Sequence, residues 1–330
     1  MSCAVVLPTY RGAGFLHERL AGIFAQTHLP TEVIVIDDGS PDDTPAIMSG
    51  YVNRVLYRRT ENLGVQAARN FGVDLATSDW IVFADQDDLW EPDHIRRTLA
   101  LAEADPALAM IFSDFRVLRD GAYLPRTKFE EAPQGWWDSV IAQRLPEGWL
   151  LNDSICAATL RFHPIFPSAL AMRRDFFHAL GGFDTVLRGN RAEDGPFVTR
   201  ALVLGRAGAV PYPTVTIRKH ADNFSADSSM PDKMLNLLHE ISNLRYLRDR
   251  FPEMVPLRDA IDQEIVVRSK LAAEAAFAIG DHARMREILR AVPLQARDRK
   301  LALKVAVAAL PDPVALPLNR LLQGLAKLRA

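Results

Sequence analysis

Two closely spaced carboxylates are the residues of this 330-residue chain with the most evident chemistry. Asp85 and Asp87 follow the apolar run Trp80–Ala84. Side chains two positions apart at a strand end point the same way, so both carboxylates can share one small site. They repel each other unless a proton or a cation lies between them. The pattern therefore predicts either a site for a hard divalent cation or a solvated acidic turn at the start of a helix, since Asp88 and Glu91-Pro92 follow.

A second acidic cluster, Asp37-Asp38-Gly39-Ser40, follows the apolar run Val33–Ile36. A carboxylate at the end of a strand can accept hydrogen bonds from a base N–H group or from ribose hydroxyls. The other interpretation is a plain turn, in which Asp and Gly are present for their backbone geometry. The residues by themselves leave both interpretations open.

Short apolar runs alternate with amphipathic stretches through the first half of the chain. The runs are Ala4–Leu7, Val33–Ile36, Val52–Tyr57 and Trp80–Ala84, and helical periodicity marks Phe15–Gln26 and Val65–Ala76. This alternation predicts an α/β fold in which a mostly parallel sheet is flanked by helices on both faces. Ligands of such sheets bind at the carboxyl ends of the strands. Pro8-Thr9-Tyr10 and the two acidic clusters each follow a strand, so we expect them to converge on one edge.

Nine motifs follow one another in a recognisable order. They are Val5–Tyr10, Gln26, Glu32–Ser40, Asn62-Leu63-Gly64, Ala68-Arg69-Asn70, Phe83–Asp88, Gly181-Gly182-Phe183-Asp184, Glu193-Asp194, and Arg218-Lys219-His220 with Asn223 and Ser225. This pattern, over roughly residues 2–226, resembles glycosyltransferase family 2. The resemblance implies a GT-A fold, inversion at the anomeric carbon of the transferred sugar, and Mg²⁺ or Mn²⁺ as the cofactor.

The resemblance also implies roles for single residues. Nucleotide-sugar binding is implied for Pro8, Thr9, Tyr10, Asp38, Arg69, Asp85 and Gly182. The metal is implied to bind Asp87 as the main ligand, with His220 completing the site and Asp85 contacting the ribose or, through water, the metal. Asp194 is the candidate general base and Glu193 is the reserve candidate, because in this family the Glu-Asp pair faces the acceptor hydroxyl.

The chain departs from the family pattern directly after Glu193-Asp194. Relatives usually continue with a further acidic residue, whereas Gly195-Pro196-Phe197 follows here. Proline is favourable in the first turn of a helix and phenylalanine can pack, so we expect a helix to begin at this point all the same.

The stretch from about Asp114 to Phe166 is long and poorly periodic. Such a stretch inside a compact domain is usually functional or disordered. Trp136 and Trp137 lie in it. Their rings could stack on an acceptor sugar, or they could fill a hydrophobic gap.

After Thr216 the pattern becomes helical. Amphipathic helices are expected over Met234–Phe251, Ile265–Ile279 and Ala283–Val292, the second closed by Gly280-Asp281. The predicted domains are a GT-A domain over residues 1–226 and a helical C-terminal extension over 227–330. Within the first, 1–113 form the nucleotide-binding half and 114–226 the acceptor-binding half.

The end of the chain is basic. Residues 297–329 contain seven Lys or Arg residues and two Asp residues, interleaved with Leu, Val and Ala. One interpretation is a pair of interfacial helices that contact anionic lipid. The other is packing on the catalytic domain or on another subunit, which leaves a homo-oligomer open.

Bulk composition narrows the class of protein. The formal net charge is −2, which gives no electrostatic reason to expect nucleic acid as a partner. Cys3 and Cys156 fit no zinc spacing and no disulfide framework, and we expect both to be small buried residues.

The apolar runs of the chain are too short to predict secretion or a membrane span. Ala4–Leu7 is too short for the apolar part of a signal peptide. Leu301–Leu310 is too short for a membrane-spanning helix, because Lys304 interrupts it and Pro311 ends it. We therefore expect a cytoplasmic protein, with or without peripheral contact at the inner face of the membrane.

The sequence thus predicts an inverting, metal-dependent glycosyltransferase. It would move a sugar from a nucleotide-diphospho-sugar donor to a glycan or lipid-linked glycan acceptor, in bacterial surface polysaccharide synthesis. Two alternatives stay open. One is an inactive sugar-nucleotide-binding scaffold. The other is a sugar-phosphate nucleotidyltransferase, for which Pro8-Thr9-Tyr10-Arg11-Gly12 is a poor substitute for a glycine-rich phosphate loop.

Overall fold

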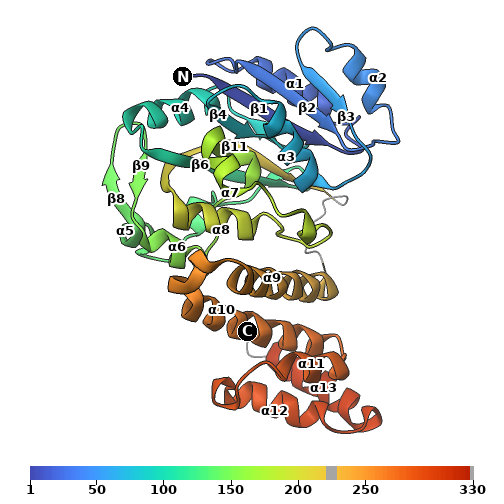
Figure 1. The fold of residues 1–330 in the computed structure, drawn as a ribbon. Coiled ribbons are helices and arrows are strands. Elements are labelled where there is room, and N and C mark those ends of the chain that lie inside the picture. The colour runs from blue at the N-terminus through green and yellow to red at the C-terminus, as the bar shows by residue number, and fades with distance from the viewer. Residues whose placement is uncertain (221–228, 328–330) are drawn as a thin grey trace. The chain divides into compact units, whose positions relative to one another are not determined.

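The chain divides into two compact units. The computed structural model describes residues 1–220 and 229–327 (Figure 1). One unit consists of Met1–Gly189 and Glu193–His220, and the other of Asn190–Ala192 with the described residues after His220. The predicted domain boundary at residue 226, and the motif residues Asn223 and Ser225, lie outside the described residues.

The first unit is built on one mixed sheet. In the described part of the chain its strands are β1 Cys3–Thr9, β2 Glu32–Asp37, β3 Leu56–Arg59, β4 Trp80–Phe83, β5 Leu89–Trp90, β6 Leu108–Arg119, β7 Ala122–Tyr123, β8 Ile141–Arg144, β9 Trp149–Leu151, β10 Leu170–Arg173 and β11 Arg206–Lys219. Their main order is β3-β2-β1-β4-β10-β6-β11-β9-β8. Neighbours are parallel from β3 to β4 and again between β6 and β11, and antiparallel at the other steps. The parallel sheet expected from the sequence is thus the N-terminal half of a mixed one.

Helices cover both faces of this sheet (Figure 1). They are α1 Leu16–Phe24, α2 Thr44–Ser49, α3 Val65–Leu75, α4 His94–Ala104, α5 Trp136–Val140, α6 Ser154–Ala158, α7 Arg174–Leu180 and α8 Gly195–Leu204. Side chains of successive residues in β1 point to opposite faces of the sheet, as in any β-strand. Val5 belongs to the core that includes Leu20 of α1. On the other face a Cβ at Gly72 of α3 would lie 2.4 Å from the side chain of Val6, so α3 can approach β1 this closely only because residue 72 is glycine.

Two segments of the first unit differ from the sequence-based expectation. A strand was expected over Val52–Tyr57, but β3 begins at Leu56 and Val52 is exposed. The short helix α2 and a turn in which Arg54 N–H donates to the Tyr51 carbonyl take up the preceding residues. The poorly periodic stretch 114–166 is built from short strands and helices. Its period is obscured because each element lasts only a few residues. Cys3 and Cys156 are both buried and unbridged, as expected.

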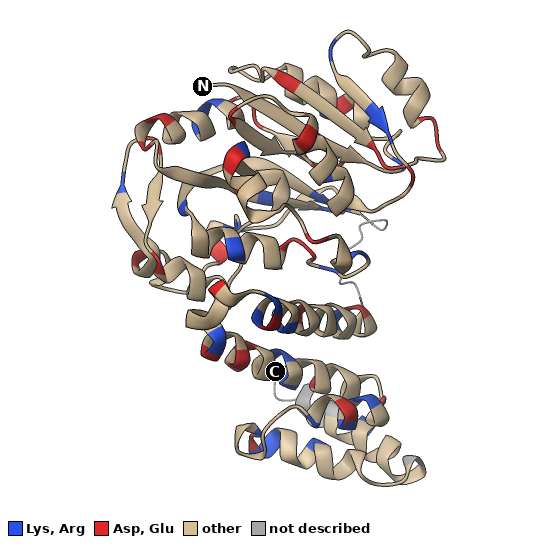
Figure 2. Cartoon of the chain, viewed as in Figure 1, with Lys and Arg blue, Asp and Glu red and all other residues tan. Residues whose placement is uncertain are grey.

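The second unit is helical. Its helices are α9 Met230–Arg250, α10 Arg258–Ala278, α11 His282–Leu289, α12 Arg299–Ala308 and α13 Asp312–Lys327. The three helices expected from periodicity are therefore present as α9, α10 and α11. Gly280, with φ +81°, permits the turn between α10 and α11. Basic and acidic residues are interspersed on these helices (Figure 2).

Candidate active site

Three strand ends form one edge of the first unit. β1 pairs with β2 so that Thr9 lies beside Asp37, and with β4 so that Val6 lies beside Phe83. Gln86, between the two carboxylates that follow β4, connects these ends. Its Oε1 accepts hydrogen bonds from Thr9 Oγ1 at 2.6 Å and Tyr10 N–H at 3.0 Å, and its Nε2 donates to the Tyr10 carbonyl at 3.1 Å. Pro8-Thr9-Tyr10 and Asp85-Gln86-Asp87 are therefore brought together, as the sheet topology predicts.

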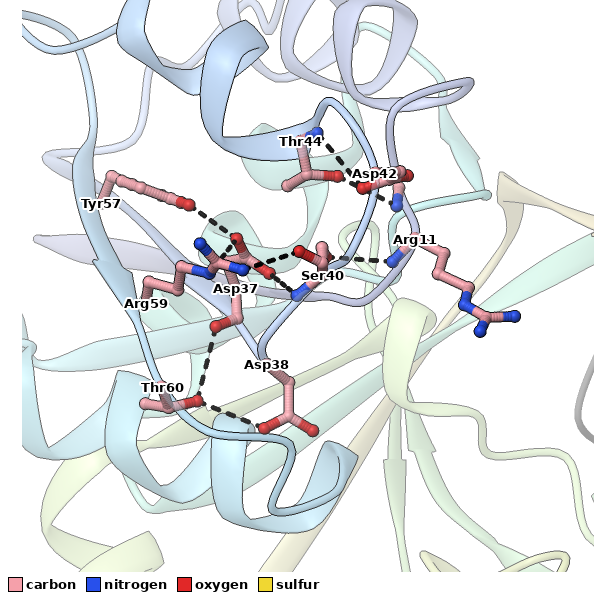
Figure 3. Close-up of polar contacts among 10 residues, drawn as sticks. Arg11, Asp37, Asp38, Ser40, Asp42, Thr44, Tyr57, Arg59 and Thr60 are labelled. Carbon is pink, nitrogen blue, oxygen red and sulfur yellow. Dashed lines mark hydrogen bonds and ion pairs between the residues drawn. The ribbon is translucent and has the colours of Figure 1, made fainter.

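The two carboxylates at the end of β2, Asp37 and Asp38, have different surroundings (Figure 3). Asp37 is buried, where Tyr57 Oη donates to Oδ2 at 2.6 Å and Ser40 N–H donates to Oδ1 at 2.8 Å. Asp37 therefore anchors the end of the strand.

Asp38 organises the loop 60–64, which leads into α3. Its two carboxylate oxygens accept hydrogen bonds from the N–H groups of Leu63 and Gly64, each at 2.7 Å, and Thr60 Oγ1 donates at 3.2 Å. Each carboxylate oxygen can accept more than one hydrogen bond, so these contacts still leave Asp38 able to accept from a base or ribose. Nucleotide contact by Asp38 stays a prediction.

Arg69 joins the strand-end edge to the second half of the unit. Its Nη2 lies 2.7 Å from Asp85 Oδ1 and its Nη1 lies 3.8 Å from Glu193 Oε1. The Arg69 side chain is 5% exposed, so the pairing is well shielded from solvent. A buried guanidinium is retained only where carboxylates offset its loss of hydration. The guanidinium of Arg69 thus links Asp85, which is expected at the donor, with Glu193, which is expected at the acceptor. These residues are far apart in the chain, so no local sequence pattern predicts the contact.

Glu193 has an unusual acidity. Burial, together with the negative charge of Asp194, raises the pKa of Glu193 to about 7, while Arg69 acts in the opposite direction. A carboxyl with a pKa near the working pH can exchange a proton during a reaction. Asp194 follows directly and is the N-cap residue of α8, although its side chain does not cap the helix.

The loop Gly181-Gly182-Phe183 is held by Asn70 of α3. Asn70 Nδ2 donates to the Phe183 carbonyl and Asn70 Oδ1 accepts from Phe183 N–H, both at 2.9 Å. A Cβ at Gly182 would lie 2.7 Å from Asn70 Oδ1, and its φ is +74°, so a side chain here would disturb the clamp. The Ala68-Arg69-Asn70 motif therefore fixes Glu193 and this loop from neighbouring positions of one helix.

The helix after Glu193-Asp194 forms despite the departure from the family pattern. α8 begins at Gly195 with Pro196 in its first turn, and Phe197 is buried with its ring centroid 4.2 Å from that of Phe183. The Gly-Pro-Phe sequence thus starts a helix and packs it under the Gly-Gly-Phe loop, as expected.

Asp87 and His220 come together from distant parts of the sequence. His220 Nε2 lies 3.0 Å from Asp87 Oδ2, and the His220 ring stacks on Phe15 with centroids 5.2 Å apart. Among the described residues, no three His, Cys, Asp or Glu side chains group as a metal site. A carboxylate oxygen and an imidazole nitrogen that face each other can still hold a divalent cation whose other ligands are diphosphate oxygens and water. Asp85 is ion-paired with Arg69, so its contribution to a metal site stays a prediction.

A buried polar cluster lies behind these carboxylates, and sequence reasoning missed it. Arg19 is 1% exposed, and its guanidinium lies 4.0 Å from the Trp90 ring centroid. Burial lowers the pKa of Arg19 to about 10, and the negative charge of Asp88 opposes this shift. Burial, together with the neighbouring negative charges of Asp87 and Asp85, raises the pKa of Asp88 to about 8. The signal was available: position 19 lies three residues after the core residue Leu16, on the buried face of α1.

Trp136 and Trp137 lie in an aromatic cluster. The ring centroid of Trp137 lies 4.2 Å from that of Phe129 and 5.1 Å from that of Trp149, and Trp137 Nε1 donates to the Phe129 carbonyl at 3.0 Å. Trp136 is buried against Phe162, at 5.2 Å between centroids. These contacts organise the stretch 114–166, and acceptor binding by either ring stays a prediction.

The architecture defines the class of the protein. A mixed sheet flanked by helices, with polar residues at the ends of β1, β2 and β4, is the GT-A fold. Staphylococcus aureus TarS 1-349, solved with UDP-GlcNAc, matches with a TM-score of 0.54 at 16% identity, over 90% of this chain and 83% of that one. The mannosyltransferase PcManGT from Pyrobaculum calidifontis, solved with GDP-Man and Mn²⁺, matches with a TM-score of 0.54 at 20% identity, over 93% and 85%. Identities this low show the fold alone.

Sequence similarity identifies the family. The family model described as glycosyl transferase family 2 matches residues 4–165, so this segment belongs to glycosyltransferase family 2. The succinoglycan biosynthesis protein ExoW of Rhizobium meliloti is 41% identical over 98 residues, which are 28% of this chain and 31% of ExoW. The putative teichuronic acid biosynthesis glycosyltransferase TuaG of Bacillus subtilis is 28% identical over 137 residues, or 40% and 53%. The match thus spans about a third of the one relative and about half of the other.

Proposed function

We propose that this chain is an inverting, metal-dependent glycosyltransferase. It would move a sugar from a nucleotide-diphospho-sugar donor to a glycan or lipid-linked glycan acceptor in bacterial surface polysaccharide synthesis. The single observation that carries this proposal is the pairing of Arg69 with Asp85 on one side and Glu193 on the other. The pairing joins a residue of the expected donor edge to the expected base pair. The names of ExoW and TuaG support a role in polysaccharide synthesis, and TarS and PcManGT support a nucleotide-sugar donor.

Asp87 and His220 are the residues that would hold the divalent cation, either Mg²⁺ or Mn²⁺. Such a cation, when bound, neutralises the charge that develops on a departing diphosphate. Their side chains meet at 3.0 Å although 133 residues separate them in the chain. Pro8, Thr9, Tyr10, Asp38, Arg69, Asp85 and Gly182 are proposed to surround the donor, because Gln86, Arg69 and Asn70 tie their loops together.

Asp194 is the proposed general base. Its carboxylate would take the proton of the acceptor hydroxyl, within about 2.6–3.2 Å of it, as that oxygen forms a bond to the anomeric carbon. The bond from this carbon to the diphosphate oxygen breaks on the opposite face, and the electron pair leaves with the diphosphate. Glu193, held against Arg69, would keep the paired carboxylates in place and remains the reserve base.

A thermal-shift panel tests the donor site. We would measure the melting temperature with UDP-, GDP-, dTDP- and CDP-sugars, each with Mn²⁺ and with EDTA. A specific ligand stabilises the folded state by about 2.7 kcal/mol at one hundred times its Kd. We expect one nucleotide class to stabilise the protein with metal, and the effect to be lost in Asp87→Ala. No response to any donor in folded protein would contradict the proposal.

A transfer assay separates the enzyme from the inactive scaffold. With the donor class identified above, wild-type protein should release nucleoside diphosphate in the presence of a glycan acceptor, whereas Asp194→Asn should keep the thermal shift and lose the release. A wild type that binds donor but never releases the diphosphate would favour the scaffold.

We propose that the protein is cytoplasmic and that its C-terminal helices contact the inner face of the cell membrane. α13 exposes Val314, Leu318 and Leu321, which lie on one helix face, and Arg320 is also exposed. No helix among the described residues is long and apolar enough to cross a membrane. Flotation with anionic liposomes, with and without residues 296–330, tests the contact. Equal flotation of the two proteins would contradict it.

A further inference from the structure

A polar stripe runs along one face of α9. Asp232, Asn236, His239 and Asn243 are spaced by four, three and four residues, which places them on the same side of the helix. The apolar residues that predict this helix from the sequence lie at other positions. All four stripe residues contact the short segment Asn190–Ala192, which belongs to the same compact unit.

Arg191 is held by both its side chain and its backbone. Nη1 donates to Asn236 Oδ1 at 2.7 Å, and Nη2 pairs with Asp232 Oδ1 at 3.2 Å. The Arg191 backbone N–H donates to His239 Nδ1 at 3.0 Å. His239 can accept this bond only while Nδ1 carries no proton. Burial and the positive charge of Arg191 both lower the pKa of His239, which keeps the ring neutral.

Asn243 is 4% exposed, and both the oxygen and the nitrogen of its side-chain amide form hydrogen bonds with residues 190–192. Its Oδ1 accepts from Asn190 Nδ2 at 3.0 Å, and its Nδ2 donates to the carbonyls of Arg191 at 3.1 Å and Ala192 at 2.9 Å. The second carbonyl belongs to the peptide bond between Ala192 and Glu193. Because that peptide is planar, the hydrogen bond from Asn243 restricts the backbone nitrogen of Glu193 as well.

Ala192 shows why such restraint is needed. Its φ of +55° is in the left-handed region, which is unfavourable for an L-residue with a side chain and persists only where surrounding contacts impose it. Asn243 donates to the Ala192 carbonyl, and the other stripe residues hold Arg191 directly before it. Released from them, residue 192 would relax, and Glu193-Asp194, which follow it directly, would turn with it.

We propose that the polar stripe of α9 positions the Glu193-Asp194 pair for proton transfer, with Asn243 as the central positioning residue. The inference rests on the proposed function, since it concerns the proposed base of that reaction. Asn243 touches no reacting atom and acts through the backbone of residues 190–192. The α9 stripe thus holds the segment that leads directly into Glu193-Asp194.

Asn243→Ala and Ser242→Ala in the full chain form a matched pair, because Ser242 is the exposed neighbour on the same helix. We expect Asn243→Ala to lower kcat by ~10²-fold, the order of loss caused by a misplacement of about 1 Å, while the Kd for the donor stays within a factor of about two. Ser242→Ala should leave both unchanged. Equal kcat values in the two variants would overturn the proposal.

The pH profile adds a readout that a general loss of stability would not move. Asp194, Arg69 and Asp85 are the charged groups that face Glu193. Ionisation of Glu193 places a negative charge beside the proposed base Asp194, so it should produce a step in the pH profile of kcat/KM near pH 7. A loosened loop admits water to Glu193 and lowers its pKa, so this step should move to lower pH in Asn243→Ala. A step that stays at the wild-type pH would contradict the proposal. If Asn243→Ala does not fold, Asn236→Ala takes its place. This variant removes one hydrogen bond to Arg191 from a less buried position. It should show a smaller loss of kcat and a smaller shift of the pH profile.

Hydrogen exchange separates failure of this inference from failure of the proposed function. Absence of transfer by the wild type with every donor would overturn the proposed function. The amides of Glu193 and Asp194 should still exchange faster in Asn243→Ala than in Ser242→Ala if the stripe holds the loop. Equal exchange rates would overturn the positioning role whatever the reaction is.

Discussion

The donor edge and the base loop are held in place by different means. At the donor edge, Thr9, Asp37 and Phe83 end or nearly end parallel neighbouring strands, so backbone pairing sets their positions. The loop that carries Glu193 and Asp194 belongs to no strand. Arg69 pairs with Glu193, and Asn243 of α9 donates to the carbonyl of Ala192, the residue directly before Glu193. Backbone pairing therefore positions one half of the site, and side-chain contacts position the other.

This difference predicts where substitutions act. A change at the donor edge leaves the strand ends in place, so its effect should be confined to the bound donor. A change in the α9 side chains that hold residues 190–192 should alter turnover without altering donor binding. Arg69 pairs with both Asp85 and Glu193, so a change there should alter both. The variants below test that division, from the largest expected effect to the smallest.

Asp194→Asn should have the largest effect. Loss of a general base typically costs 10²–10⁴-fold in rate, so we expect kcat to fall in that range while the donor-induced thermal shift is kept. Steady-state kinetics together with the thermal-shift assay measure both. A variant that retains more than about a tenth of wild-type turnover would transfer the role to Glu193.

Arg69→Met should affect both halves at once. It leaves Asp85 and Glu193 without their shared cation, and breaking a buried pair costs roughly 3 kcal/mol, near the lower end of its range because Asp85 is 28% exposed. Urea unfolding should show this loss, and donor binding and turnover should both fall. An unchanged unfolding midpoint would mean that the two carboxylates are not coupled through Arg69.

Glu193→Gln should change the pH dependence of stability. The folded-state pKa of Glu193 is about 7, above its ordinary value of 4.5. Between these two values the folded state binds more protons than the unfolded state, so the contribution of this group favours folding at low pH and is lost as pH rises through about 7. Melting temperatures from pH 4 to 8 should fall less steeply in Glu193→Gln than in wild type. Parallel curves would contradict the raised pKa.

Asn70→Ala should have the smallest effect of the four. It removes two hydrogen bonds that hold Phe183, each with a net contribution of about 1 kcal/mol. We expect a modest loss of stability and a raised KM for the donor, because the Gly182 loop is proposed to face the donor sugar. Asn70→Asp keeps the acceptor oxygen and serves as the control, since it should retain the bond from Phe183 N–H. Identical KM values in all three proteins would remove this loop from the donor site.

Sequence reasoning anticipated the elements that carry the site better than the contacts between them. The strands of β1, β2 and β4 and the clusters that follow them were predicted, because apolar runs and strand-end motifs are local patterns. β3 was placed too early, since α2 and the turn after it leave no periodic trace in so few residues. Arg19 was missed although it lies on the buried face of α1, because a charged residue is normally exposed.

The sequence by itself determined the fold class, the family and the order of the motifs along the sheet edge. Periodicity and strand-end chemistry depend only on neighbouring residues, so they can be read directly from the chain. The family resemblance implied that Asp87 and His220 share one site, and the structure brings them together. Only the tertiary structure decided that Arg69 lies between Asp85 and Glu193 and that Asn243 holds the peptide before Glu193. Each of these contacts joins residues far apart in sequence. Their side chains meet because the backbone between them is folded. A local sequence pattern contains no information on the spatial distance between such residues.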